Sequence, residues 1–213
     1  MSHSISTKSG LLRTLRLAGA VSTFLLGACV LAEAAPAGGN EAKAVQVVGQ
    51  ARSLAVSIER DQLSRDAQKK KWDELRDLVD SQNISEFVLA DKWAAATPPQ
   101  RRGFANALSD LVVQRLSERL GNPMAEPFEI GMTRTLDGGD VIVVSHVKFR
   151  DGHTGELDWR LRSSGAKMAV ADVLVDGVSV AVAARDEAAT ELKSNGGSIA
   201  QLVASMRNRL RFK

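Results

Sequence analysis

The segment Phe128-Glu129-Ile130-Gly131-Met132-Thr133 places an apolar side chain at every second position. A period of two is typical of a strand with one covered face. Gly-, Asp- and Ser-containing turn signals separate it from three further apolar stretches, at residues 141–149, 157–162 and 168–175. Short connections join strands that are neighbours in a sheet, so the four strands are predicted to form an antiparallel meander.

Helical periodicity, with apolar residues three or four positions apart, occurs on both sides of this meander. Four helices are predicted before it and two after it, at residues 41–60, 63–80, 83–92, 97–121, 179–193 and 198–210. The clearest helix start is Thr97-Pro98-Pro99-Gln100, because Thr97 and Gln100 can form a capping box. The order of helices, strands and helices predicts an α+β fold.

Residues 1–34 have the pattern of a secretion signal peptide. Three basic residues precede an apolar stretch at 17–32, which is shorter than the roughly 20 residues of a membrane-spanning helix. The motif Ala32-Glu33-Ala34 predicts cleavage after Ala34. An alternative is a lipoprotein, because Leu26-Gly27-Ala28-Cys29 has the form of a lipobox.

This cleavage divides the chain into a signal peptide (1–34), a flexible Ala/Gly-rich start (35–42) and a single domain (43–213). Cys29 is the single cysteine, so no disulfide or thiolate metal cluster can form within the chain. The net charge of +3 falls to +1 without the three basic residues and one acidic residue of the signal. This balance, with six Phe, three Trp and no Tyr, gives no support for nucleic-acid binding.

Enzymatic readings are disfavoured. The segment Gly177-Val178-Ser179-Val180-Ala181 approaches the nucleophile elbow G-x-S-x-G, but Ala181 replaces its last glycine and the predicted sheet is antiparallel. No H-x-x-x-H, C-x-x-C, P-loop or G-x-G-x-x-G motif occurs, so neither a metal site nor a nucleotide site is predicted.

Several segments resemble one family. They are Ile84-Ser85-Glu86-Phe87-Val88-Leu89, Leu157-Asp158-Trp159-Arg160-Leu161 and the run from Ala171 to Ser179 that contains Asp176-Gly177. Together they resemble the MlaC (toluene-tolerance auxiliary) family of periplasmic proteins, over roughly residues 45–210.

The resemblance implies a curved antiparallel sheet covered by helices around an apolar cavity. It also implies a phospholipid carrier without a catalytic cofactor, in which the bound phospholipid is cargo. The implied partners are an inner-membrane ABC transporter complex with an MCE-domain protein and an outer-membrane lipoprotein complex. Together these would maintain outer-membrane lipid asymmetry. A hopanoid-associated branch is also similar, which leaves a second lipid class open.

Candidate cavity residues are the apolar side chains at inward positions of the predicted elements. They are Leu75, Leu78, Val79, Phe104, Leu108, Leu111, Val143, Val147, Trp159 and Leu174. Periodicity cannot separate a cavity wall from a filled core, because both need apolar residues at inward positions. Trp159 is as well suited to anchoring the core as to contacting a ligand.

Two charged sites have structural and functional readings. Asp172 and Asp176 flank the last strand, where Arg160 and Arg162 can form ion pairs with them or where a lipid headgroup can bind. The basic run from Arg207 to Arg211 fits a solvated helix face or a docking surface. The main alternative function is an envelope interaction or assembly protein with a filled core and no ligand.

Overall fold

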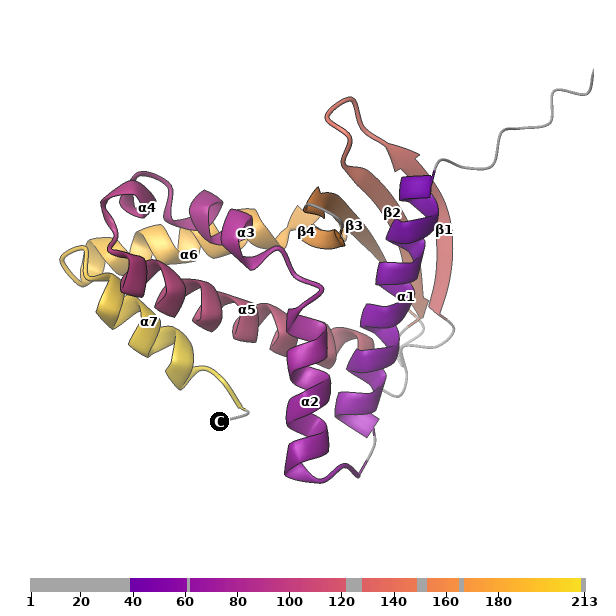
Figure 1. Cartoon of the computed structure of the whole chain (residues 1–213), viewed down its shortest axis with the longest axis horizontal. Coiled ribbons are helices and arrows are strands. Elements are labelled where there is room, and N and C mark those ends of the chain that lie inside the picture. The colour runs from indigo at the N-terminus through magenta and orange to yellow at the C-terminus, as the bar shows by residue number, and fades with distance from the viewer. Residues whose placement is uncertain (1–38, 61, 122–127, 149–152, 165–166, 212–213) are drawn as a thin grey trace, which may run out of the picture. The chain divides into compact units, whose positions relative to one another are not determined.

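The computed structural model describes residues 39–60, 62–121, 128–148, 153–164 and 167–211 (Figure 1). Its strands form one antiparallel sheet in chain order, as the meander predicts. The strands are β1 (Phe128–Thr135), β2 (Val141–Lys148), β3 (Thr154–Ser164), β4 (Lys167–Val175) and β5 (Val178–Ser179). The predicted α+β class and the meander are confirmed, with β5 as an addition.

The two-residue strand β5 lies beyond the reach of periodicity, which needs at least four residues to be visible. It forms because Asp176 and Gly177 both have positive φ angles, of 49° and 81°. This tight turn folds Val178 and Ser179 back onto Val175 and Leu174.

The helices are α1 (Gly39–Arg60), α2 (Arg65–Arg76), α3 (Ser81–Leu89), α4 (Asp91–Ala95), α5 (Pro98–Gly121), α6 (Val180–Ser194) and α7 (Ile199–Asn208). The segment 35–42, predicted to be flexible, is helical from Gly39. The Thr97 capping box forms as predicted: the Thr97 amide donates to Gln100 Oε1 at 2.9 Å, and the Gln100 amide donates to Thr97 Oγ1 at 3.4 Å.

Two helix boundaries differ from the predictions. The helix predicted at 83–92 is interrupted at Ala90, whose positive φ of 47° ends α3 and starts α4. The helix predicted at 63–80 ends at Arg76, because the next residues pair with the sheet instead. The Asp80 amide donates to the Val170 carbonyl at 2.9 Å, and the Val170 amide donates to the Leu78 carbonyl at 2.7 Å.

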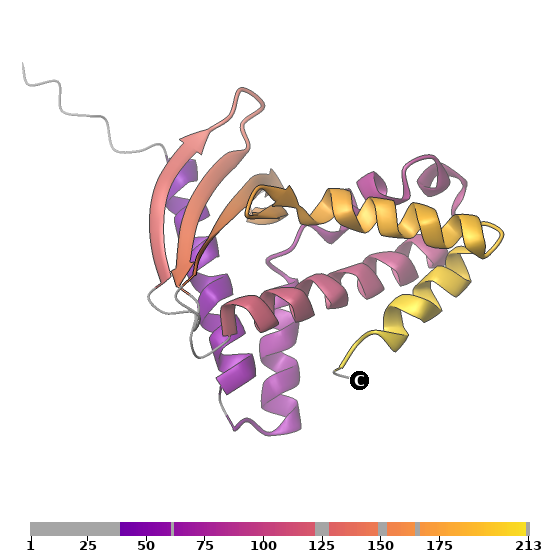
Figure 2. The same cartoon turned by 180° about the vertical axis from the view of Figure 1, so that it is seen from behind.

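Helix α1 covers the apolar face of the sheet, and β1 and β2 curve around it (Figure 2). Its inner stripe consists largely of small side chains, including Ala44, Val48, Ala51 and Ala55, all 0% exposed. Small residues allow a helix to approach the strands closely. Among the described helices, none is both long and apolar enough to cross a bilayer.

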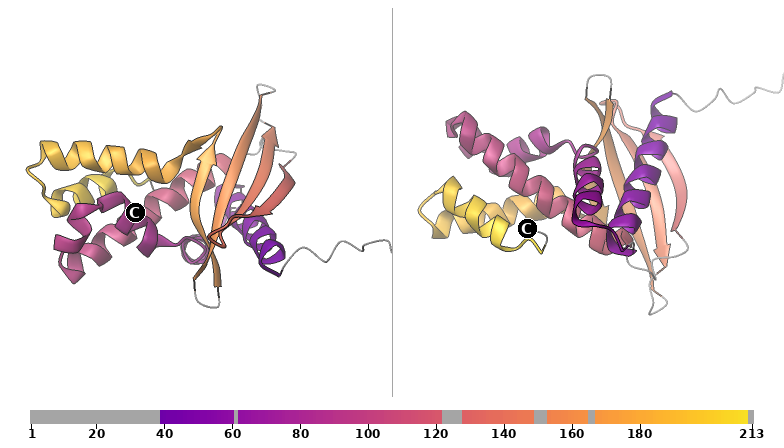
Figure 3. Two further views of the ribbon diagram at one scale, coloured as in Figure 1. Left: turned by 90° about the horizontal axis from the view of Figure 1, so that it is seen from above. Right: turned by 60° about the horizontal axis from the view of Figure 1, so that its bottom comes forward.

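The remaining helices group beside the outer part of the sheet. In Figure 3, β4 lies next to α3 and α6. A cavity lies at this junction between helices and sheet.

Candidate functional site

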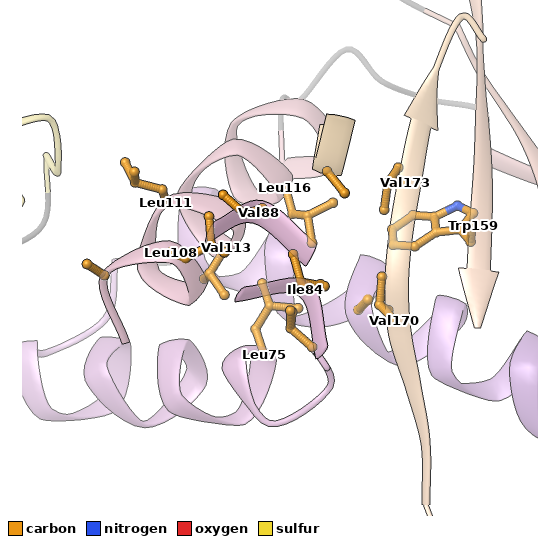
Figure 4. Packing of buried hydrophobic residues seen from close by; sticks show 14 of the residues in the cluster. Leu75, Ile84, Val88, Leu108, Leu111, Val113, Leu116, Trp159, Val170 and Val173 are labelled. Atoms are coloured by element: carbon orange, nitrogen blue, oxygen red, sulfur yellow. The ribbon is translucent and has the colours of Figure 1, made fainter. Parts of the chain in front are cut away.

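A cavity of about 310 Å³ lies between α5, the start of α6, the middle of α3 and β4. Its walls are mainly aliphatic: Ile84, Leu108, Val112, Leu116, Val170, Val173, Val175, Val180, Ala181 and Ala184. Figure 4 shows Ile84 and Leu116 pointing from their helices toward Val170 and Val173 on β4. The volume is at the lower end of the range of about 300–1,000 Å³ for ligand pockets.

In the described part of the chain, the outer edge of β4 is paired at Val170 and again at Leu174 and Val175, but not at residues 171–173. Val170 bonds to the segment 78–80, and Leu174 and Val175 pair with β5. Between these pairings, β4 also carries an extra residue, since Asp172 faces Arg160 while Val170 faces Leu161. Such a bulge bends a strand. The uncovered middle of β4 therefore faces the apolar sides of α5 and α6 across the cavity.

Charged side chains form the rim. Arg115, Glu118 and Arg119 come from α5, and Asp172 comes from β4. Arg115 Nη2 lies 3.4 Å from both carboxylate oxygens of Glu187 on α6, and Glu118 pairs with Arg211 at 2.7 Å. An apolar interior with a charged, exposed rim can hold an aliphatic chain and leave a polar end in water.

A second, smaller hollow of about 30 Å³ continues along the seam between α5 and α6 toward α7. It shares Leu108, Val112, Arg115, Val180 and Ala184 with the main cavity. The two spaces therefore lie on either side of one row of side chains.

The predicted candidate residues fall into two groups. Leu108 lines the main cavity, and Phe104, Leu108 and Leu111 line the smaller hollow. The others line neither: Leu75, Val143, Val147 and Trp159 are fully buried, Val79 is buried at the pairing with β4, and Leu78 and Leu174 are half-buried. Leu174 pairs with Asp158, so strand alternation places it on the face of β4 opposite Val173.

Most residues of the cavity wall were not among the predicted candidates. The residues that were missed include Ile84, Leu116, Val173, Val180 and Ala184. These residues belong to periodic apolar faces that also fit a filled core. For two of them a signal was available, because Val173 lies within the run Ala171–Ser179 that carries the family resemblance and Val180 follows it directly.

In the structure, Trp159 is a buried residue that anchors the packing of the core. It is 0% exposed, its Nε1–H donates to Ser145 Oγ at 2.9 Å, and the Ser145 hydroxyl donates to the Leu157 carbonyl at 3.2 Å. Figure 4 shows the indole next to Val173, its cross-strand neighbour. The indole therefore stands one strand behind the cavity wall.

The predicted ion pairs between Asp172 or Asp176 and Arg160 or Arg162 do not form. Asp172 Oδ1 accepts from the amides of Val173 at 2.8 Å and Ala181 at 3.0 Å, and its Oδ2 accepts from the Ser179 hydroxyl. Asp176 Oδ1 accepts from the Glu156 amide at 3.0 Å. Both carboxylates hold backbone in place, because sharp turns leave amides that need acceptors.

We expect Asp172→Asn to lower the free energy of unfolding by about 1–3 kcal/mol, because an amide group presents a donor where two amides and a hydroxyl already donate. Urea unfolding measures this change. The matched control is Asp186→Asn on the exposed side of α6, expected within about 0.5 kcal/mol of wild type. An equal effect of both substitutions would contradict this role for Asp172.

Arg160 and Arg162 instead bind Asp140, which follows the β1–β2 turn. Arg160 Nε donates at 2.6 Å, and Arg162 donates through Nε and Nη2 at 2.9 Å each. The bond from Arg162, followed by that from Arg160, holds the pKa of the Asp140 carboxyl below its usual 3.8 despite the opposing effect of burial.

A lowered folded-state pKa means that the Asp140 carboxylate contributes its full stabilisation above pH 3.8 and loses it as the pH falls through the lower folded value. We expect Asp140→Asn to lower the free energy of unfolding at neutral pH by about 1–2 kcal/mol. The difference from wild type should shrink below pH 3.8. Urea unfolding across this range tests the prediction, which a pH-independent difference would refute.

Ser179 is the N-cap residue of α6. Its hydroxyl oxygen accepts from the Val182 amide at 3.0 Å, and its hydroxyl hydrogen is donated to Asp172. The pairings of β4 with β3 and with β5 are both antiparallel. Among the described residues, no three His, Cys, Asp or Glu side chains gather closely enough to hold a metal ion.

The predicted signal peptide, its cleavage site and Cys29 lie outside the described residues.

Comparisons with known proteins agree with this architecture. A family model described as MlaC protein matches residues 51–208, so the chain belongs to the MlaC family, as its sequence motifs indicate. A solved structure, the phospholipid-binding protein from Ralstonia solanacearum in complex with a phospholipid, has a TM-score of 0.63 at 22% identity. That match covers 80% of this chain and 96% of the other, and it establishes a shared fold. No curated protein sequence matches the chain.

Proposed function

We propose that the protein is a periplasmic phospholipid carrier, the soluble auxiliary component of an MCE-type ABC transport system that maintains outer-membrane lipid asymmetry. The observation that carries this proposal is the aliphatic cavity of about 310 Å³ with a charged rim, in a chain of the MlaC family. The phospholipid held by the structural neighbour from Ralstonia solanacearum supports the choice of ligand.

The energetics suit a carrier without catalysis. Burying about ten methylenes of an acyl chain gains roughly 8 kcal/mol, which corresponds to micromolar binding before the costs of ordering. A bilayer removes the same methylenes from water, so exchange of the chain between bilayer and cavity is nearly balanced. A carrier can therefore work by partition, while the ABC transporter supplies energy from ATP.

The proposed location follows from the export signal. The chain enters the periplasm with its signal removed after Ala34, or with a lipid attached at Cys29 if the lipobox is used. There it exchanges lipid with an outer-membrane lipoprotein complex and with the MCE-domain protein of the inner-membrane transporter.

Native mass spectrometry of residues 35–213, purified without detergent and followed by solvent extraction, tests the proposal. A bound mass that resolves into phospholipid is the expected result. A hopanoid or other lipid would keep the cavity as a lipid site but overturn the proposed cargo. Protein that is bare and still takes up no lipid from phospholipid vesicles would overturn the carrier function and favour the assembly protein with no ligand.

A further inference from the structure

Arg115 occupies a particular position on the rim of the cavity. Its side chain lines both the main cavity and the smaller hollow, so it stands where the two apolar spaces meet. It extends from α5 toward α6, where its carboxylate partner, Glu187, is located. An amphiphile with its chain in the cavity would bring its polar end to this guanidinium.

The hydrogen bonds between Arg115 and Glu187 are long. Arg115 Nη2 is 3.4 Å from each oxygen of Glu187, whereas charge-assisted N–H···O bonds are typically about 2.7–2.9 Å long. The two side chains are 45% and 48% exposed, so water screens their attraction. A better-placed anion can therefore replace Glu187 without breaking a buried contact.

The acidic groups on the rim are engaged elsewhere. Glu118 pairs with Arg211 at 2.7 Å, and Asp172 accepts bonds from two amides and the Ser179 hydroxyl. Arg119, one helical turn beyond Arg115, also lines the main cavity. The carboxylates of Glu118 and Asp172 are thus occupied by the protein, while Arg115 makes the long contact to Glu187.

The geometry points to a phosphate-binding subsite at Arg115 for a phospholipid whose acyl chain occupies the cavity, with Glu187 as the carboxylate that the phosphate replaces. A guanidinium presents paired N–H donors that match the oxygens of a phosphate. This assignment rests on the proposed function, because it needs a chain in the cavity.

The test compares two probes with identical acyl chains, phosphatidylglycerol and diacylglycerol, which differ in whether they carry a phosphate. Residues 35–213 are incubated with vesicles containing both, and the retained ratio is read by native mass spectrometry. We expect wild type to prefer phosphatidylglycerol on the order of tenfold, the contribution of a hydrogen bond to a charged group.

Three variants separate phosphate binding from structural support. Arg115→Met is expected to lose the preference for phosphatidylglycerol. Glu187→Gln is expected to increase this preference, because the competing carboxylate is gone while Arg115 remains. Arg102→Met, at an exposed position of α5 outside both hollows, is the matched control and is expected to behave as wild type. A purely structural ion pair would make Arg115→Met and Glu187→Gln change the ratio in the same direction or leave it unchanged.

Each remaining outcome is decisive. Retention of both lipids with the same ratio in wild type and Arg115→Met overturns the phosphate subsite and keeps the carrier function. Retention of neither lipid by wild type overturns the carrier function and the subsite with it. Binding of inorganic phosphate that Arg115→Met abolishes, in a wild-type protein with no preference between the two lipids, would show that Arg115 binds free phosphate, which overturns its assignment to a lipid headgroup.

Discussion

Ala184→Phe is expected to lower the affinity for phospholipid more than a hundredfold while the protein stays folded. Ala184 lies on the seam between α5 and α6 and lines both the main cavity and the smaller hollow. A phenyl ring there takes the space of about four methylenes of an acyl chain. At about 0.8 kcal/mol for each methylene, their exclusion costs roughly 3 kcal/mol of binding free energy.

The ring enters space that is already empty, so it does not force a packed core apart. The measurements are the lipid retained in native mass spectrometry and a titration with a fluorescent phospholipid, both on protein whose thermal unfolding is intact. Ala189→Phe is the matched control, on an exposed position of the same helix. Unchanged lipid content in folded Ala184→Phe protein would show that this cavity is not the lipid site.

Trp159→Ala is expected to have the largest effect on stability, about 3–5 kcal/mol. The indole is 0% exposed, and domains of this kind have a total free energy of unfolding of only about 5–15 kcal/mol. Urea unfolding of residues 35–213 measures the change. Loss of lipid with an unchanged unfolding midpoint would instead identify Trp159 as a ligand contact.

Two milder variants separate packing from hydrogen bonding at this position. Trp159→Phe keeps most of the buried ring and removes the N–H donor, while Ser145 keeps its bond to the Leu157 carbonyl. Ser145→Ala leaves the buried Nε1–H without its acceptor, which costs about 1–3 kcal/mol. We therefore expect both to be milder than Trp159→Ala.

The sequence predicts those parts of the fold that depend on local chemistry. The capping box at Thr97, the helix of residues 98–121 and the four long strands each depend on residues a few positions apart. The break at Ala90 was missed because alanine favours helix, and only the surrounding structure imposes its positive φ. The end of α2 was misplaced because residues 78–80 are drawn into pairing with Val170, some ninety positions later.

The walls of the cavity could not be predicted from pattern for a related reason. Leu108 and Leu75 are both apolar residues at inward helical positions, yet Leu108 lines the cavity and Leu75 is packed on all sides. The difference lies in what stands opposite each side chain. For Leu108 this is set by the pairing of β4 at Val170 and at Leu174 and Val175, and by the bulge between these positions.

The pairing of β4 also bears on when the cavity can arise during folding. Its supporting strand segments come from residues 78–80 and 178–179, and its opposite walls come from α3 and α5. The contacts of β4 with residues 78–80 and with α3 join positions some ninety residues apart, and such contacts form late because long loops must close first. Shortened chains that stop before β5 should therefore build much of α1 and the meander but enclose no cavity. Lipid uptake would then begin only when nearly the whole chain has folded.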